Sequence, residues 1–240
     1  MVFMSSQKLQ LHEYFLRFLF PPRCICCDTL LPFKNPMELC SDCRENLPVM
    51  HKFEHRTPDG TNIGKVYCVF GYEKGIRKAI HNLKFSDRPG NAATLVDLSY
   101  SYLERFFADN SVPFMPLPVY DIILCVPMHP GRKRKRGYNQ SELLAERLAR
   151  RMNIPALKKV MVKAVNTPAQ SALGKAGRFR NLIGAFKVKA PDLVKGKRIL
   201  LVDDVMTTGN TLEQCGKVLK DEGAIQVDAF VVAMRRKLSG

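Results

Sequence analysis

Four stretches of the chain are dominated by apolar residues and bounded by turn-forming residues, which is typical of strands buried inside a sheet. They cover residues 66–72, 121–127, 198–204 and 224–236, and the third reads RILLVDD. A shorter apolar run at 160–165 predicts a weaker strand.

Between these runs the apolar positions recur at helical spacing. This pattern predicts helices over residues 75–85, 92–107, 140–152 and 211–222. Strands that alternate with helices indicate an α/β domain with a mostly parallel sheet and helices on both faces. Ligands of such sheets bind outside the carboxyl ends of the strands, so the segments after residues 127 and 202 are the informative ones.

The N-terminal part follows a different pattern. Apolar residues at helical spacing predict a helix over residues 9–20, which Pro21 and Pro22 end. A cysteine-rich segment follows to about residue 47, and the polar stretch 51–64 is typical of a linker or a long hairpin. We therefore expect a small module at 1–50, a linker at 51–65 and the α/β domain at 66–240.

Five of the eight cysteines lie within twenty residues of the N-terminal module. The pairs Cys24/Cys27 and Cys40/Cys43 have a two-residue spacing and are separated by twelve residues. Two such pairs can supply four thiolates to one tetrahedral Zn²⁺, and four thiolates leave no open position, so the zinc would be structural. Cys26 could stand in for Cys27, although the spacing favours Cys27; the alternative is a reduced loop without metal.

The segment ILLVDDVMTTGNT, residues 199–211, carries the most specific chemistry. A buried strand leads to Asp203 and Asp204, which we expect at an exposed strand end, and then to a turn rich in threonine before a helix. Backbone amides, hydroxyls and a helix N-terminus suit a phosphate. Carboxylates repel a phosphate but accept bonds from vicinal hydroxyls or help to hold hydrated Mg²⁺. A ligand with all three features is a sugar phosphate.

Two further segments are basic. The first follows the strand at 121–127, contains five consecutive cations from Arg132 to Arg136, and is either a solvated surface or an anion clamp. The second, residues 166–186, is a candidate lid that carries Lys175 and Arg178, which could stabilise the charge of a departing pyrophosphate.

Charge is concentrated in one third of the chain. The protein has 240 residues and a formal net charge of +16, and residues 131–198 alone hold 19 Lys and Arg against three Asp and Glu. This excess favours a polyanionic partner such as nucleic acid, or else a merely soluble basic surface. No apolar run is long enough to span a bilayer and no secretory signal is apparent, so we expect a cytoplasmic protein without membrane insertion.

The 199–211 segment resembles the phosphoribosyl pyrophosphate (PRPP) loop of type I phosphoribosyltransferases. The resemblance implies that Asp203 and Asp204 take the ribose hydroxyls, with Mg²⁺ accompanying the ligand. It also implies a cradle for the 5-phosphate formed by Met206, Thr207, Thr208, Gly209, Asn210 and Thr211. The basic segment after the strand at 121–127 would bind pyrophosphate or another anion through Arg132, Arg136, Gly137, Asn139 and Gln140.

Taken together, the motifs resemble those of the competence protein F (ComF) family. That family is similar in its paired CxxC motifs, a Leu-Lys-Phe/Tyr segment (here 83–85), an Arg-Gly-Phe/Tyr-Asn-Gln motif (136–140), and a lid with Gln170, Arg178, Asn181 and Phe186. The resemblance implies a phosphoribosyltransferase-like sheet with an N-terminal zinc module. It also implies a role in natural competence, with single-stranded DNA and the DNA-uptake machinery as partners.

Two alternatives to a PRPP-binding, DNA-handling protein stay open. One is a genuine phosphoribosyltransferase that acts on a small nucleophile. The other is an adaptor that keeps the PRPP site as a relic.

Overall fold

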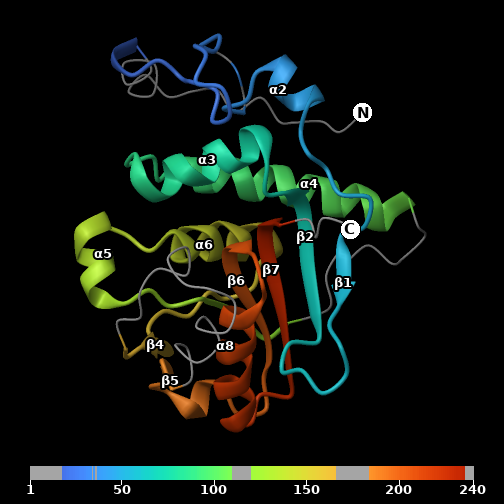
Figure 1. Cartoon of the computed structure of the whole chain (residues 1–240), viewed down its shortest axis with the longest axis vertical. Coiled ribbons are helices and arrows are strands. Elements are labelled where there is room, and N and C mark those ends of the chain that lie inside the picture. The colour runs from blue at the N-terminus through green and yellow to red at the C-terminus, as the bar shows by residue number, and fades with distance from the viewer. Residues whose placement is uncertain (1–17, 34, 36, 110–119, 166–183, 236–240) are drawn as a thin grey trace.

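The computed structural model describes residues 18–33, 35, 37–109, 120–165 and 184–235. A five-stranded sheet forms the centre of the molecule, in the order β1-β2-β7-β6-β3 (Figure 1). The strands are β1 (Glu54–Arg56), β2 (Lys65–Gly71), β3 (Ile122–Cys125), β6 (Arg198–Met206) and β7 (Gln226–Met234). Only β1 runs antiparallel to its neighbour. The expected mostly parallel α/β architecture is confirmed.

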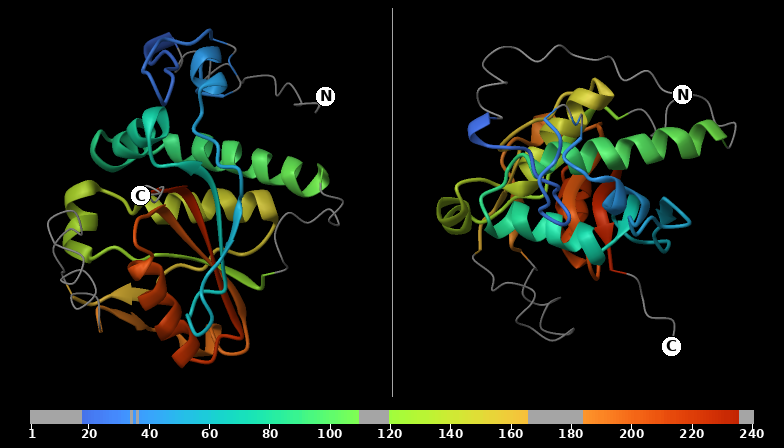
Figure 2. Two further views of the ribbon diagram at one scale, coloured as in Figure 1. Left: turned by 45° about the vertical axis from the view of Figure 1, so that its right-hand side comes forward. Right: turned by 90° about the horizontal axis from the view of Figure 1, so that it is seen from above.

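Helices cover both faces of this sheet (Figure 2). One face packs against α6 (Gln140–Met152) and α4 (Asn91–Asp109), which also pack against each other; the other face packs against α8 (Asn210–Asp221). Leu200 and Val202 of β6 enter the first core, while Ile199 and Leu201 enter the second. Because successive strand residues point to opposite faces, a strand between two helical layers must be apolar where it is covered, as the ILLV run at 199–202 is.

Smaller elements complete the α/β part. The antiparallel pair β4 (Met161–Lys163) and β5 (Phe186–Val188) packs beside α8. A short 3-10 turn, η2 (Pro191–Leu193), precedes β6. The basic run lies on α5 (Pro130–Arg136), a helix that we did not expect.

The N-terminal module lies above α3 (Lys74–Phe85) and α4, at the top of Figure 1. Its described residues include the short helix α2 (Ser41–Glu45), and its buried residues Ile25 and Leu39 join the core cluster of α3, α4 and α6. The stretch considered as a linker or a hairpin contains β1, which pairs with β2 and adds a strand to the sheet. The domain boundaries stay a prediction.

None of the described helices combines the length and apolar character needed to cross a membrane. The predicted helix at 9–20 falls almost wholly outside the described residues.

Candidate functional site

A cleft of about 720 Å³ opens at the carboxyl ends of β3 and β6. It collects residues from α3, the segment after β3, α5, the start of α6, β4 and the loop after β6. Its charged lining residues are Arg77, Lys84, Arg132, Arg136, Lys163, Asp203, Asp204 and Arg235. Two acids surrounded by six cations suit a ligand that has both hydroxyls and phosphates.

Asp203 and Asp204 lie in β6, inside the cleft rather than at an exposed strand end. Asp204 is only 4% exposed, so the expectation that both acids are exposed is wrong. Oδ1 of Asp203 accepts hydrogen bonds from Ser141 Oγ at 2.8 Å and from the Asp204 amide at 2.9 Å. Burial, together with the adjacent Asp204 charge, raises the pKa of Asp203 to about 7. The Asp203 carboxylate is therefore held in place before any ligand binds.

Lys84 explains why Asp204 can be buried. Its Nζ lies 2.8 Å from Asp204 Oδ2. Burial by itself would lower the pKa of Lys84, but the attraction of Asp204 outweighs it and the pKa is raised. A buried carboxylate needs such a partner, because an unpaired charge away from water is very costly.

The loop after β6 turns sharply before α8. Gly209 has a φ of +80°, a left-handed conformation that glycine adopts without strain, and it caps the N-terminus of α8. The side chains of Thr207 and Thr208 are exposed, while Thr207 and Thr211 both line the cleft. A helix N-terminus of this kind attracts anions through its amides and its dipole.

The basic segment after β3 forms the opposite wall. The His129 side chain caps α5 by accepting a hydrogen bond from the Gly131 amide at 3.1 Å. Helix α5 ends at Gly137, whose φ is +87°. Arg136 donates a hydrogen bond to Gln140 Oε1, and both line the cleft.

The side chains of Asn139 and Tyr138 form hydrogen bonds with other residues of the chain. Asn139 caps α6 by accepting from the Ser141 amide, and its Nδ2 donates to the Val126 carbonyl at 3.1 Å. Tyr138 donates its hydroxyl to the Leu83 carbonyl at 2.7 Å. These bonds join three segments of the cleft wall. The expectation that Asn139 binds an anion stays a prediction.

Four cations of the cleft were missing from our expected site residues. Arg77 and Lys84 are two helical turns apart on α3 and so share a face, a spacing that was visible in the sequence. Lys163 and Arg235 carried no comparable signal, because they reach the cleft through the fold. Burial and the nearby charge of Arg132 lower the pKa of Lys163. The candidate lid residues Gln170, Lys175, Arg178 and Asn181 lie outside the described residues.

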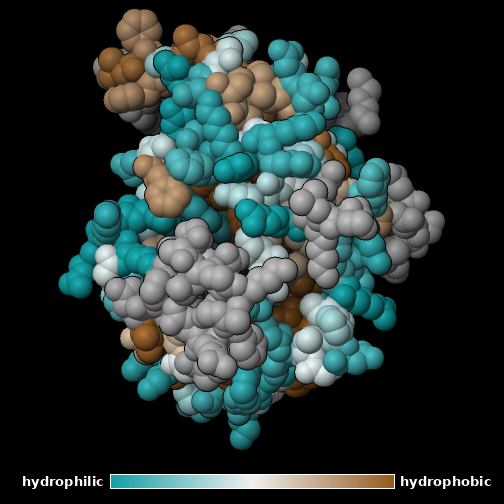
Figure 3. Space-filling view, in the orientation of Figure 1, coloured by the Kyte–Doolittle hydropathy of each residue, from teal (hydrophilic) through white to brown (hydrophobic). Residues whose placement is uncertain are grey.

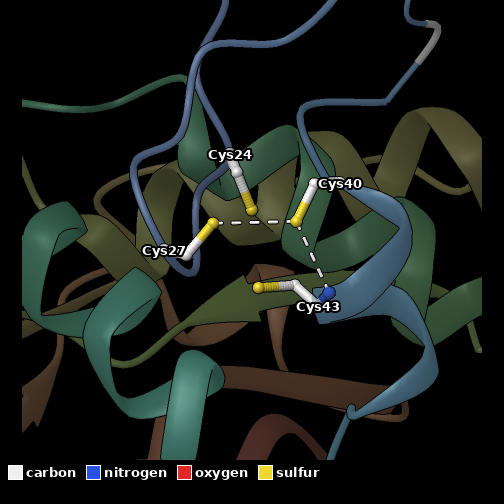
Figure 4. Close-up of side chains that lie close together, drawn as sticks. All are labelled: Cys24, Cys27, Cys40 and Cys43. Atoms are coloured by element: carbon white, nitrogen blue, oxygen red, sulfur yellow. Dashed lines mark hydrogen bonds between the residues drawn. The ribbon is translucent and has the colours of Figure 1, made fainter.

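A second site lies in the N-terminal module, where Cys24, Cys27, Cys40 and Cys43 point toward one another (Figure 4). Their Sγ atoms all lie within 4.8 Å of one another, so they could hold a metal ion. Cys27 and Cys40 Sγ are 3.6 Å apart, much longer than a disulfide bond of about 2.05 Å.

Cys26 does not belong to this cluster. It is buried, and a Cβ placed on Gly75 would lie 2.6 Å from its Cβ. The thiol therefore packs against the start of α3, which removes the alternative that Cys26 replaces Cys27. Two further contacts fix the cysteine turn: Lys78 donates to the Cys27 carbonyl, and Arg88 pairs with Asp28 at 2.6 Å.

Comparison with known proteins gives consistent results. A family model described as "Phosphoribosyl transferase domain" matches residues 139–239. "DNA utilization protein YhgH" of Escherichia coli (strain K12) is 32% identical over 198 residues, which are 80% of this chain and 82% of the relative. "Competence protein ComFC" of Bacillus subtilis is 31% identical over 197 residues, 81% of this chain and 71% of the relative. "Competence protein F" of Haemophilus influenzae is 34% identical over 118 residues, 49% of this chain and 52% of the relative.

Proposed function

Since the chain belongs to the competence protein F family of phosphoribosyltransferase-like proteins, we propose that it binds PRPP with Mg²⁺ and handles single-stranded DNA in the cytoplasm during DNA uptake. The observation that carries the PRPP part is the juxtaposition of two acids, a helix N-terminus and six cations in one cleft. The names of the relatives and the basic third of the chain support the DNA part.

In this proposal each wall of the cleft recognises one part of PRPP. Asp203 and Asp204 accept hydrogen bonds from the ribose hydroxyls, and Ser141 and Lys84 hold the two carboxylates in position. The turn from Met206 to Thr211 takes the 5-phosphate at the N-terminus of α8.

The wall formed by α5 takes the pyrophosphate. Arg132 and Arg136 line it, and guanidinium groups bind phosphate oxygens with charge-assisted hydrogen bonds. Gln140 orients Arg136 by accepting its hydrogen bond. Mg²⁺ would neutralise part of the pyrophosphate charge, with the carboxylates of the cleft near its water ligands.

The metal of the N-terminal module is proposed to be zinc. Four sulfurs at the corners of a tetrahedron, each with a bond of about 2.3 Å to Zn²⁺, lie roughly 3.8 Å apart. The 3.6 Å between Cys27 and Cys40 Sγ fits this spacing. Four thiolates close the coordination shell, so this zinc would stabilise the module and not act on substrate.

Calorimetric titration with PRPP and Mg²⁺ tests the proposal, with Asp203→Asn and Asp204→Asn as variants. We expect micromolar binding by the wild type and a loss of roughly 10- to 150-fold in each variant, because each removes a charged hydrogen-bond acceptor. Asp192→Asn is the matched control, since Asp192 is exposed on η2 before β6. Absence of PRPP binding by folded wild-type protein would make the site a relic and favour an adaptor.

The same samples distinguish a binding protein from a transferase. Incubation with PRPP and candidate nucleophiles, followed by assay of released pyrophosphate, reports transfer. Release that requires a nucleophile and is lost in Asp203→Asn would establish an enzyme.

A further inference from the structure

The Leu83-Lys84-Phe85 segment at the end of α3 has one member without a role in the proposed function. Leu83 is fully buried in the core, and Lys84 pairs with Asp204. Phe85 is 66% exposed, although it lines the cleft. The Phe85 ring is therefore accessible to a ligand that occupies the cleft.

The surroundings of the Phe85 ring indicate the chemistry of that ligand. The guanidinium carbon of Arg136 lies 5.0 Å from the ring centroid. The His81 ring lies 4.9 Å from it, tilted by 44°. Planar groups thus gather at the rim, beside a cleft that is rich in cations. A flat aromatic ligand that carries a phosphate matches both features.

We propose that Phe85 is a stacking platform for a nucleobase whose phosphate is held by the cations of the cleft. The inference rests on the proposed function in one respect, namely that the cleft binds phosphates. Base–aromatic stacking does not depend on which base is present, so the platform suits a single strand of any sequence. Arg136 reinforces it, because a guanidinium stacks on aromatic faces and pairs with phosphates.

Two other exposed aromatic residues differ from Phe85 in their distance from the cleft. Phe18 and Phe20 are 77% and 75% exposed on the N-terminal module, where apolar side chains gather at the top of the surface (Figure 3). Neither lines the cleft. The position of Phe85 beside the cations therefore distinguishes a nucleotide platform from an apolar contact surface.

The experiment measures binding of three probes by fluorescence anisotropy or calorimetry: a single-stranded oligonucleotide, an abasic strand of equal length, and adenosine monophosphate. The variants are Phe85→Ala, Phe85→Tyr, and Phe18→Ala as the matched aromatic control. We expect Phe85→Ala to weaken binding of the base-containing strand by roughly 5- to 150-fold, the range found when a stacking aromatic is removed. Binding of the abasic strand stays unchanged, and Phe85→Tyr and Phe18→Ala behave as wild type.

The probes separate the possible sources of the base. A Phe85-dependent affinity for adenosine monophosphate alone would support the platform and assign it to a free nucleotide. Equal binding of every probe by Phe85→Ala and wild type would overturn the proposal. PRPP titration of Phe85→Ala separates this outcome from a failure of the proposed function: Phe85-dependent base binding without PRPP binding would sustain the platform and refute the PRPP site.

Discussion

Asp203 illustrates how the cleft combines opposing demands on one side chain. To accept bonds from ribose hydroxyls on both oxygens, its carboxyl must be ionised. Burial and the neighbouring Asp204 charge oppose ionisation and raise its pKa from 3.8 to about 7. The folded protein therefore binds this proton more tightly than the unfolded chain does.

This raised pKa predicts a pH-dependent stability. The contribution of Asp203 to the free energy of unfolding is fully present below about pH 4 and is lost as the pH rises through about 7. Asp203→Asn keeps an oxygen that can accept the Ser141 bond but has no charge to bury. We expect the variant to exceed the wild type in stability at pH 8 by about 1 to 4 kcal/mol, with a smaller difference at pH 5, measured by urea denaturation. A variant less stable than wild type at pH 8 would contradict this.

Residues that act through local sequence were predictable, and those that act through distant partners were not. Asp203, Asp204 and Gly209 follow one another in a single strand and turn, so their proximity is visible in the sequence. The exposure of Asp204 was mispredicted because its burial depends on Lys84, 120 positions earlier in the chain. No local pattern announces such a pair.

At the level of elements, the strongest apolar runs form strands as predicted, whereas the basic run forms a helix that was not predicted. Strand β3 lies within the predicted run at 121–127. Strand β6 covers the predicted run at 198–204 and continues for two more residues. Helix α5 was not expected, because its five consecutive cations repel one another and show no apolar stripe. Helix α5 starts with a proline in its first turn and is capped by His129, and proline in this position is a common start of a helix.

The contact between the cysteine module and α3 can be tested at Gly75. A Cβ there would lie 2.6 Å from Cys26 Cβ and 2.9 Å from its Sγ. We expect Gly75→Ala to destabilise the protein by about 1 to 3 kcal/mol through overpacking and to weaken metal retention by the module. Thermal unfolding and metal analysis after dialysis against a chelator measure both effects.

Gly90→Ala is the matched control, since a Cβ at Gly90 meets no atom within 4 Å. If the two variants proved equally stable, the module would rest on α3 more loosely than the packing indicates.

For the molecule as a whole, charge distribution governs the expected behaviour with DNA. Arg134 and Lys135 are exposed on α5 near the cleft, whereas Lys195 and Lys197 are exposed before β6, at the other end of the sheet. Both pairs belong to the basic third of the chain. If DNA bound to any basic surface, both pairs would contact its phosphates equally. If single-stranded DNA bound at the cleft, only Arg134 and Lys135 would contact it.

We therefore expect Arg134→Gln with Lys135→Gln to lower the salt dependence of single-stranded DNA binding. The slope of log affinity against log salt should fall by about 1.4, since each lost phosphate contact contributes about 0.7. Lys195→Gln with Lys197→Gln should leave the slope at the wild-type value. Equal reductions in both double variants, measured by anisotropy at several salt concentrations, would indicate binding without a defined path.

The sheet order was the part of the architecture least accessible from sequence. Alternating strands and helices predict a parallel sheet, but not that β7 lies between β2 and β6. The pairs β2–β7 and β3–β6 join strands that are far apart in the chain, and apolar runs of similar composition do not specify which of them pair.

This position of β7 has a consequence for how the protein is made. β7 is the last of the described strands in chain order, yet it joins β2 on one side to β6 on the other. While the ribosome still holds residues 226–234, β2 and the β3–β6 pair cannot share a sheet, and the backbone N–H and C=O groups along the edges that β7 will pair with have no strand partner. The four cysteines, by contrast, emerge early and close together. Nascent chains arrested before Gln226 should be cut readily by protease in the α/β part, and chains arrested well beyond Met234 should resist.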